Sequence, residues 1–92
     1  MNLASVIVPS AQVVTSRVGE ETVILHLENG TYYGLNAVGT RVWDLVQGGS
    51  TLQSVFETLL EEYGVSEDVL KADLDLLIQD LISHDLIHEK NT

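Results

Sequence analysis

ENGTYYGLNAVGTRVWDLV, residues 28–46, is the stretch that decides the fold of this 92-residue chain. Within it, Asn29-Gly30 is the strongest short signal for a β-hairpin, because both residue types tolerate the positive φ angles of a tight turn. Residues 31–35 then return as a strand. Asn36 can cap a helix through its side chain, and apolar residues follow it at helical spacing. The stretch therefore predicts a strand that leads directly into a helix.

Two further strands precede this stretch. Residues 12–18 are rich in valine, and residues 22–28 carry apolar side chains at every second position, which is typical of a half-buried strand. Gly19 lies in the turn that joins them. We therefore expect a three-stranded antiparallel meander, with its last strand at the edge of the sheet.

The register of the last two strands depends on the length of their turn. A two-residue turn at Asn29-Gly30 places Leu27 opposite Tyr32 and therefore His26 opposite Tyr33. Both faces of this strand pair then carry apolar side chains. The pattern leaves open which of the two tyrosines faces the core.

Three helices are expected after the sheet. The first contains Trp43 on an apolar face and ends at the glycines 48–49. The second begins at a capping box formed by Ser50 and Gln53 and ends near Gly64. Trp43 is expected in the core, because a tryptophan beside valines at helical spacing is more often a core residue than a ligand platform.

The third helix is capped by Ser66 and extends over about residues 67–84. One apolar stripe is expected to face the core. It consists of Leu70, Leu74, Leu77 and Leu81. A second stripe alternates apolar and acidic residues. It consists of Val69, Asp73, Leu76 and Asp80. This second stripe is either a solvated boundary of the core or one wall of a groove that takes an apolar anchor and a cationic or amide group.

A three-stranded antiparallel sheet followed by three helices is an α+β fold of the winged helix-turn-helix type. Residues 1–10 are expected to be a flexible N-terminus, and residues 11–92 a single domain with a short extended tail after residue 84. The first residues lack the basic and long apolar segments of a signal peptide, and no apolar stretch is long enough to span a membrane. We therefore expect a cytoplasmic protein.

The charge excludes several classes of partner. Fourteen acidic residues stand against four basic ones, which gives a net charge of −10. Nucleic acid and anionic membranes both require lysine and arginine, so neither is an expected partner, and a winged-helix regulator of transcription is a weak alternative. There is no cysteine for a disulfide, a thiolate metal site or a thiol nucleophile.

No combination of residues predicts catalysis. His84 and His88 stand four apart, but a third metal ligand is not evident. Ser83 is only a sequence neighbour of His84, which does not make a catalytic triad. We therefore expect no enzymatic activity, no metal and no cofactor.

The strand at residues 31–35 has an unusual composition for an edge. It contains Tyr32, Tyr33 and Gly34 but neither lysine nor proline, which commonly protect edges from pairing. An open edge beside a helix wall is the layout for β-augmentation, in which a peptide joins the sheet as an added strand. The alternative is that the protein's own tail or a second copy covers the edge.

Two longer segments resemble a known family. YYGLNAVGTRVWDLV at residues 32–46 and LEEYGVSEDVLKADLDLLIQDLISHDLI at residues 60–87 are similar to the PqqD-like family, whose members are recognition elements for the precursors of ribosomally made, modified peptides. The resemblance covers about residues 12–87. Its most specific parts are Gly39-x-x-x-Trp43-x-Leu45 and the ending Asp85-Leu86-Ile87, where many family members have glycine in place of the aspartate.

The resemblance implies a non-catalytic module that binds the leader segment of a precursor peptide. The leader adds as a strand to the third strand and packs on the third helix. A separate member of this length looks most like the leader-binding protein of lasso-peptide pathways, which works with a leader peptidase and an ATP-dependent cyclase. The alternative within the family is a peptide chaperone for a radical-SAM enzyme, as in pyrroloquinoline quinone synthesis. The implied binding residues are Tyr32, Tyr33, Gly34, Leu35, Val69, Asp73, Leu76, Leu77 and Asp80.

Overall fold

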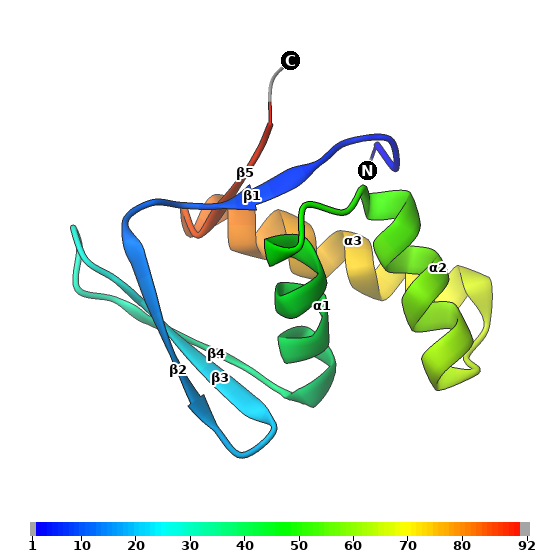
Figure 1. The fold of residues 1–92 in the computed structure, drawn as a ribbon, viewed down its shortest axis with the longest axis horizontal. Helices are drawn as coiled ribbons and strands as arrows, with labels where there is room; N and C mark the ends of the chain where they lie inside the picture. Colours follow the sequence, from blue (N-terminus) through cyan, green and yellow to red (C-terminus); the bar gives the residue numbers. More distant parts are fainter. Residues whose placement is uncertain (1, 91–92) are drawn as a thin grey trace.

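The computed structural model describes residues 2–90. Three residues lie outside the described part of the chain. They are Met1, which begins the predicted segment 1–10, and Asn91 and Thr92, which are the last residues of the predicted segment 11–92. Eight elements follow one another along the chain (Figure 1). They are β1 (Ile7–Pro9), β2 (Val13–Val18), β3 (Glu21–His26), β4 (Tyr32–Leu35), α1 (Ala37–Gln47), α2 (Leu52–Tyr63), α3 (Glu67–Ser83) and β5 (Ile87–Glu89).

The strands form two antiparallel sheets. Strands β2, β3 and β4 make the expected meander, in which β3 is central and β4 lies at an edge. A second sheet, which the sequence did not predict, pairs β1 with β5. Figure 1 shows the meander on one side of α1 and α2 on the other, while α3 runs behind α1. The α+β prediction is confirmed, whereas the comparison with winged helix-turn-helix folds stays a prediction.

The first ten residues differ from the expected flexible N-terminus. Ile7 is fully buried, and Ile7–Pro9 pairs with Ile87–Glu89. Further backbone hydrogen bonds continue this attachment, because the amides of Leu52 and Gln53 donate to carbonyls of the N-terminal segment. An apolar run of three residues is too short to identify a strand by periodicity, and its partner lies at the far end of the chain.

The turn between β3 and β4 is longer than predicted, so the register is shifted by two residues. Leu25 lies opposite Tyr32, and Ile24 lies opposite Tyr33. Only Gly30 adopts a positive φ in this turn, at 70°. The side chain of Asn29 instead accepts a hydrogen bond from the backbone amide of Thr31 at 3.0 Å. The side chain of Asn29 therefore stabilises a longer loop. The predicted two-residue turn, which needs positive φ at both positions, does not form.

The shift leaves each residue on its predicted face, because two residues are one full period of a strand. It also shows which tyrosine faces inward. Tyr32 is 72% exposed on the outer face, whereas Tyr33 is half-buried on the same face as the fully buried Ile24. His26 on β3 is also buried, with 1% of its surface exposed.

The helix caps largely follow the sequence. Asn36 accepts from the amide of Gly39 at the start of α1, and Ser66 accepts from the amide of Val69 at the start of α3. The cap of α2 is Thr51 rather than the predicted Ser50, because the Thr51 hydroxyl accepts from the amide of Ser54 while its own backbone is extended.

The junction of β4 and α1 depends on a close approach. A Cβ atom at Gly39 would lie 3.1 Å from Leu35 Cδ2, which is tighter than ordinary van der Waals contact. Glycine at this position therefore lets α1 begin directly against the end of β4, and the edge strand is held at a fixed position beside the helices.

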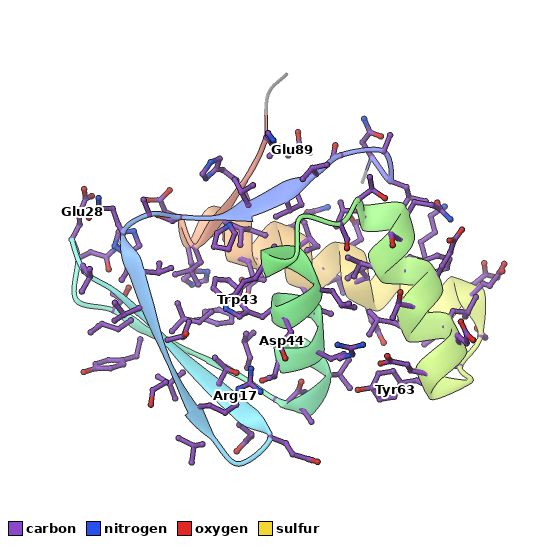
Figure 2. The ribbon with its side chains drawn as sticks, in the orientation of Figure 1. Arg17, Glu28, Trp43, Asp44, Tyr63 and Glu89 are labelled. Carbon is purple, nitrogen blue, oxygen red and sulfur yellow. The ribbon has the colours of Figure 1, made fainter. Side chains whose placement is uncertain are left out.

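The core lies between the three-stranded sheet, α1 and the inner faces of α2 and α3. The prediction that Trp43 belongs to it is confirmed, since this side chain is 2% exposed. Ion pairs support the same arrangement from the surface. Arg17 on β2 contacts Asp44 on α1 at 2.7 Å (Figure 2), and Arg41 on α1 contacts Glu62 on α2 at 2.6 Å.

The core stripe of α3 differs from the prediction at one residue. Leu70, Leu74 and Leu81 are buried as expected, but Ile78 takes the place that was assigned to Leu77. Leu77 is only half-buried. Leu77 and Ile78 are adjacent apolar residues near the same stripe, so helical spacing alone does not decide which one enters the core.

The end of α3 carries the position where the sequence has aspartate instead of glycine. Asp85 adopts a φ of 60°, and its Oδ2 lies 3.1 Å from Nε2 of His26. His26 Nδ1 accepts from the amide of Glu28 at 3.3 Å. The helix therefore ends with the left-handed residue that glycine supplies elsewhere, and the hydrogen bond to buried His26 holds this residue in place.

Candidate functional site

The open edge of β4 offers unpaired backbone groups. The amide of His26 donates to the carbonyl of Thr31 at 3.0 Å, which makes these two residues a hydrogen-bonded pair. Such pairs alternate along an antiparallel ladder, so Tyr33 and Leu35 direct their backbone groups toward β3. The N–H and C=O groups of Tyr32 and Gly34 therefore point away from the sheet.

No described segment pairs with this edge. Residues 87–89, part of the tail that was one candidate to cover it, pair with β1 instead. Gly34 adds no bulk there, and a Cβ atom at this position would meet nothing within 4 Å. The edge is thus accessible in a single copy of the chain.

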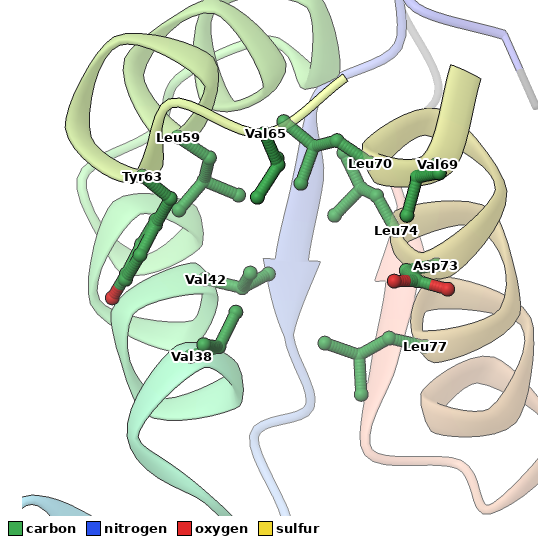
Figure 3. Close-up of a pocket in the computed structure, with 10 residues that line it drawn as sticks. All are labelled: Val38, Val42, Leu59, Tyr63, Val65, Val69, Leu70, Asp73, Leu74 and Leu77. Atoms are coloured by element: carbon green, nitrogen blue, oxygen red, sulfur yellow. The ribbon is translucent and has the colours of Figure 1, made fainter. Parts of the chain in front are cut away.

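A hollow of about 180 Å³ lies between α1, α2 and α3 (Figure 3). Side chains of α1 and α2 point toward those of α3 across it, and almost all of them are apolar. The lining residues are Val38, Val42, Leu59, Tyr63, Val65, Val69, Leu70, Asp73, Leu74 and Leu77. Val38, Tyr63 and Val69 are each more than 40% exposed, so apolar surface that the fold does not bury is collected at this hollow.

A second, more open hollow of about 450 Å³ lies between β4 and α3. Its lining residues are Tyr33, Gly34, Leu35, Asn36, Val38, Gly39, Asp73 and Leu77. Val38, Asp73 and Leu77 also line the first hollow, so the two hollows adjoin each other. We call their union the groove. It extends from the open edge of β4 to the turn between α2 and α3.

Tyr33 and Asp80 join the two walls of the groove at one end. The hydroxyl of Tyr33 on β4 donates a hydrogen bond to Oδ2 of Asp80 on α3. The ring of His84 lies edge-on to Tyr33 with 5.1 Å between centroids, and its Nδ1 is 2.8 Å from the carbonyl oxygen of Asp80. Partial burial, followed by the Asp80 hydrogen bond and charge, raises the pKa of Tyr33 to about 12. The phenol therefore stays protonated and acts as a donor at neutral pH.

The family of this chain is decided by its sequence over most of its length. The family described as "Coenzyme PQQ synthesis protein D (PqqD)" matches residues 21–87, from β3 through the start of β5. The chain belongs to the PqqD family. Among curated proteins, none matches it.

Two solved structures share the fold of this PqqD-family chain. One is described as "TbiB1 in Complex with the TbiA(beta) Leader Peptide"; it is 32% identical, with 92% of this chain and 99% of that chain covered and a TM-score of 0.85. The other is described as "Lasso peptide synthetase B1 complexed with the leader peptide"; it is 18% identical, with 90% and 98% covered and a TM-score of 0.82. Nearly the whole length of each of these two chains is therefore matched.

The structure brings most of the predicted binding residues of this PqqD-family chain to the groove. Those that line it are Tyr33, Gly34, Leu35, Val69, Asp73 and Leu77. Asp80 contributes through its bond to Tyr33. Two predicted residues lie elsewhere, since Tyr32 projects from the outer face of the sheet and Leu76 lines neither hollow and is 67% exposed. Tyr32 offers its backbone to the edge, whereas its side chain faces solvent.

Sequence reasoning missed the residues that α1, α2 and the turn after α2 contribute. Val38, Tyr63 and Val65 form the wall opposite α3, and none of them was a predicted site residue. A signal was present, because Tyr63 and Val65 are large apolar residues on either side of the helix-ending Gly64, where polar side chains are usual.

No metal site competes with the groove in the described part of the chain. Residues 2–90 contain no group of three histidine or acidic side chains placed to hold a metal ion. His84 is engaged with Tyr33 and Asp80, and His88 lies in β5 opposite Val8. Over the same residues, no helix combines the length and apolar character needed to cross a bilayer.

Proposed function

We propose that this protein binds the leader segment of a ribosomally made precursor peptide and presents it to separate processing enzymes. The leader adds to the sheet as a strand along β4 and places side chains in the groove against α3. The observation that carries the proposal is the position of the outward backbone groups of Tyr32 and Gly34, directly beside a groove that is mostly apolar. TbiB1, which is 32% identical to this chain, was solved with a leader peptide, and this likeness supports the same class of ligand.

The energy of such a complex comes from two sources. Tyr32 and Gly34 together offer two donors and two acceptors, and each backbone hydrogen bond contributes about 1 kcal/mol net. Each apolar leader side chain buried in the groove adds about 1.5–3 kcal/mol. Association entropy and the ordering of the peptide oppose binding by several kcal/mol. The balance corresponds to affinities from about micromolar to tens of nanomolar.

The proposed role requires no catalytic group in this chain. Held in an extended form, the leader keeps the attached core peptide at a high effective concentration near the enzymes that process it. We place those enzymes, a leader peptidase and an ATP-dependent cyclase, in lasso-peptide biosynthesis in the cytoplasm. The likeness in fold to the structure described as a lasso peptide synthetase B1 favours this pathway, whereas the name of the family favours the alternative, service to a radical-SAM enzyme in cofactor synthesis.

The test is a calorimetric titration of the protein with candidate leader peptides, taken from any short reading frames that neighbour its gene, followed by amide chemical-shift mapping. Saturable binding is expected, with the largest shifts at Tyr32, Gly34 and the α3 wall of the groove. Shifts confined to another face, or no binding, would overturn the proposal. Reconstitution with a lasso leader peptidase then decides the pathway, since leader removal should be faster when this protein is present.

A further inference from the structure

Asp73 is the charged residue at the centre of the groove. It lines both hollows, at the point where they join, and it is exposed to them from α3. Its neighbours in both linings, Val38 and Leu77, are apolar. Among residues 2–90, no hydrogen bond or ion pair engages the Asp73 carboxylate.

The basic residues of the chain are all placed elsewhere. Arg17 and Arg41 are paired with Asp44 and Glu62 at the surface. Lys71 lines a different hollow, with Asp68, Ala72 and Asp75. Lys90 directly follows β5, donates its backbone amide to the carbonyl of Val6 and lines neither hollow of the groove. None of these four basic side chains therefore supplies a cation to the groove.

Asp80, the other acidic residue of the α3 stripe, already has partners within the chain. Asp80 accepts from the hydroxyl of Tyr33 and lies near His84, so its position is set by the chain itself. Asp73 is thus the acceptor that a bound peptide meets. A peptide that covers it with apolar or acidic side chains would bury an uncompensated charge, which is costly.

From this arrangement we infer that the peptide held in the groove carries a lysine or arginine opposite Asp73, between side chains that fill the apolar hollow and the hollow beside β4. The inference rests on the proposed function and adds a selectivity rule to it. Backbone pairing along β4 accepts any extended peptide, whereas the carboxylate in an apolar setting discriminates by charge. The attraction is stronger there than in bulk water, because the surrounding side chains lower the effective dielectric constant.

The inference is tested by selecting binders from a display library of random linear peptides. Wild-type protein should enrich peptides with a basic residue at one fixed position relative to their apolar residues. Asp73→Lys should reverse the preference at that position to aspartate or glutamate. Glu61→Lys is the matched control, because Glu61 is exposed on α2, lines neither hollow and gives the same change in net charge. This control should keep the wild-type preference.

The affinities of the selected peptides measure how much the Asp73 carboxylate contributes to binding. Asp73→Asn should weaken the wild-type binders about tenfold, between the effects of exposed and buried charge pairs. Replacing the basic residue of the peptide by methionine should weaken binding similarly. Combining both changes should cost less than the sum of the two, because each removes the same interaction.

The outcomes separate this inference from the proposed function. Peptides that lose binding with Gly34→Pro, yet show no charge preference that follows Asp73, would refute the inference and leave the proposed function standing. A reversal caused equally by Glu61→Lys would refute it too, since overall charge would then explain the selection. No enriched peptide, together with concentration-dependent dimers in sedimentation, would assign the edge and groove to a second copy and overturn both.

Discussion

Replacing Gly34 by proline isolates the role of the β4 edge. The amide of Gly34 points away from β3, so proline removes a donor that the sheet does not use. Proline is tolerated at such edge positions, and the preceding residue is already extended, as proline requires. The substitution should therefore leave the domain folded while it blocks the pairing of an added strand.

The size of the effect follows from the groups that are lost. An added strand bonds to two donors and two acceptors, at Tyr32 and Gly34. Proline deletes one donor, and its ring occupies the space that the carbonyl of the peptide needs, so a neighbouring bond is lost as well. Two bonds at about 1 kcal/mol each correspond to about 30-fold weaker binding.

The assay is fluorescence anisotropy with the labelled leader peptide, with a melting curve for each variant. Gly34→Ala is the control, because it keeps the amide and its Cβ atom meets nothing within 4 Å. It should bind within about twofold of wild type. Wild-type affinity in a folded Gly34→Pro protein would refute strand addition at β4. Equal losses in both variants would point to crowding by any side chain at this position instead of the missing donor.

Four further outcomes are expected. Val69→Asp should weaken leader binding by about 1.5 kcal/mol or more, because Val69 lines the groove, whereas Leu76→Asp on the same helix should bind more nearly as wild type. Both side chains are more than half exposed, so both variants should melt normally. Equal binding by the two variants would place the peptide outside the groove. The raised pKa of Tyr33 means that the folded state favours the protonated phenol, so its contribution to stability is complete below pH 10 and is lost as the pH rises toward 12. Urea unfolding across this range should show that loss in wild type, and a Tyr33→Phe protein with the same slope would contradict the assignment. Leader binding should change little between low and moderate salt, because backbone bonds and apolar burial are screened weakly, and a collapse of affinity in salt would instead indicate binding by the acidic surface. The protein alone should leave the precursor peptide intact in mass spectrometry, and cleavage by pure protein would show that it is an enzyme.

Local signals in the sequence determined the elements from β2 to α3 and their order. Asn36 and Ser66 cap their helices as predicted, and Gly64 ends α2 in the left-handed conformation. Asn29-Gly30 correctly predicts the position of a turn but not the length of that turn, because the side chain of Asn29 can stabilise more than one loop. Such signals succeed because each depends on a few neighbouring residues, whose preferences the rest of the fold seldom overrides.

The candidate site was predictable in part for the same reason. The composition of β4 and the acidic stripe of α3 identified both walls, and Gly34, Val69 and Asp73 do line the groove. Leu76 shares the spacing of that stripe but lies too far toward solvent, since a helical stripe is wide and only the neighbouring helix decides which part of it is covered.

Contacts between distant parts of the chain were decided only by the tertiary structure. The pairing of Ile7–Pro9 with Ile87–Glu89 joins the two ends, and no local pattern indicates it. Tyr33 faces inward because α3 supplies Asp80 to its hydroxyl, and Leu77 borders the groove because Ile78 fills the core. Periodicity fixes which residues share a face, but which face is buried depends on what packs against it. The sequence therefore determined the strand, the turn and the helix, and the packing of α1, α2 and α3 decided that a groove opens beside the strand.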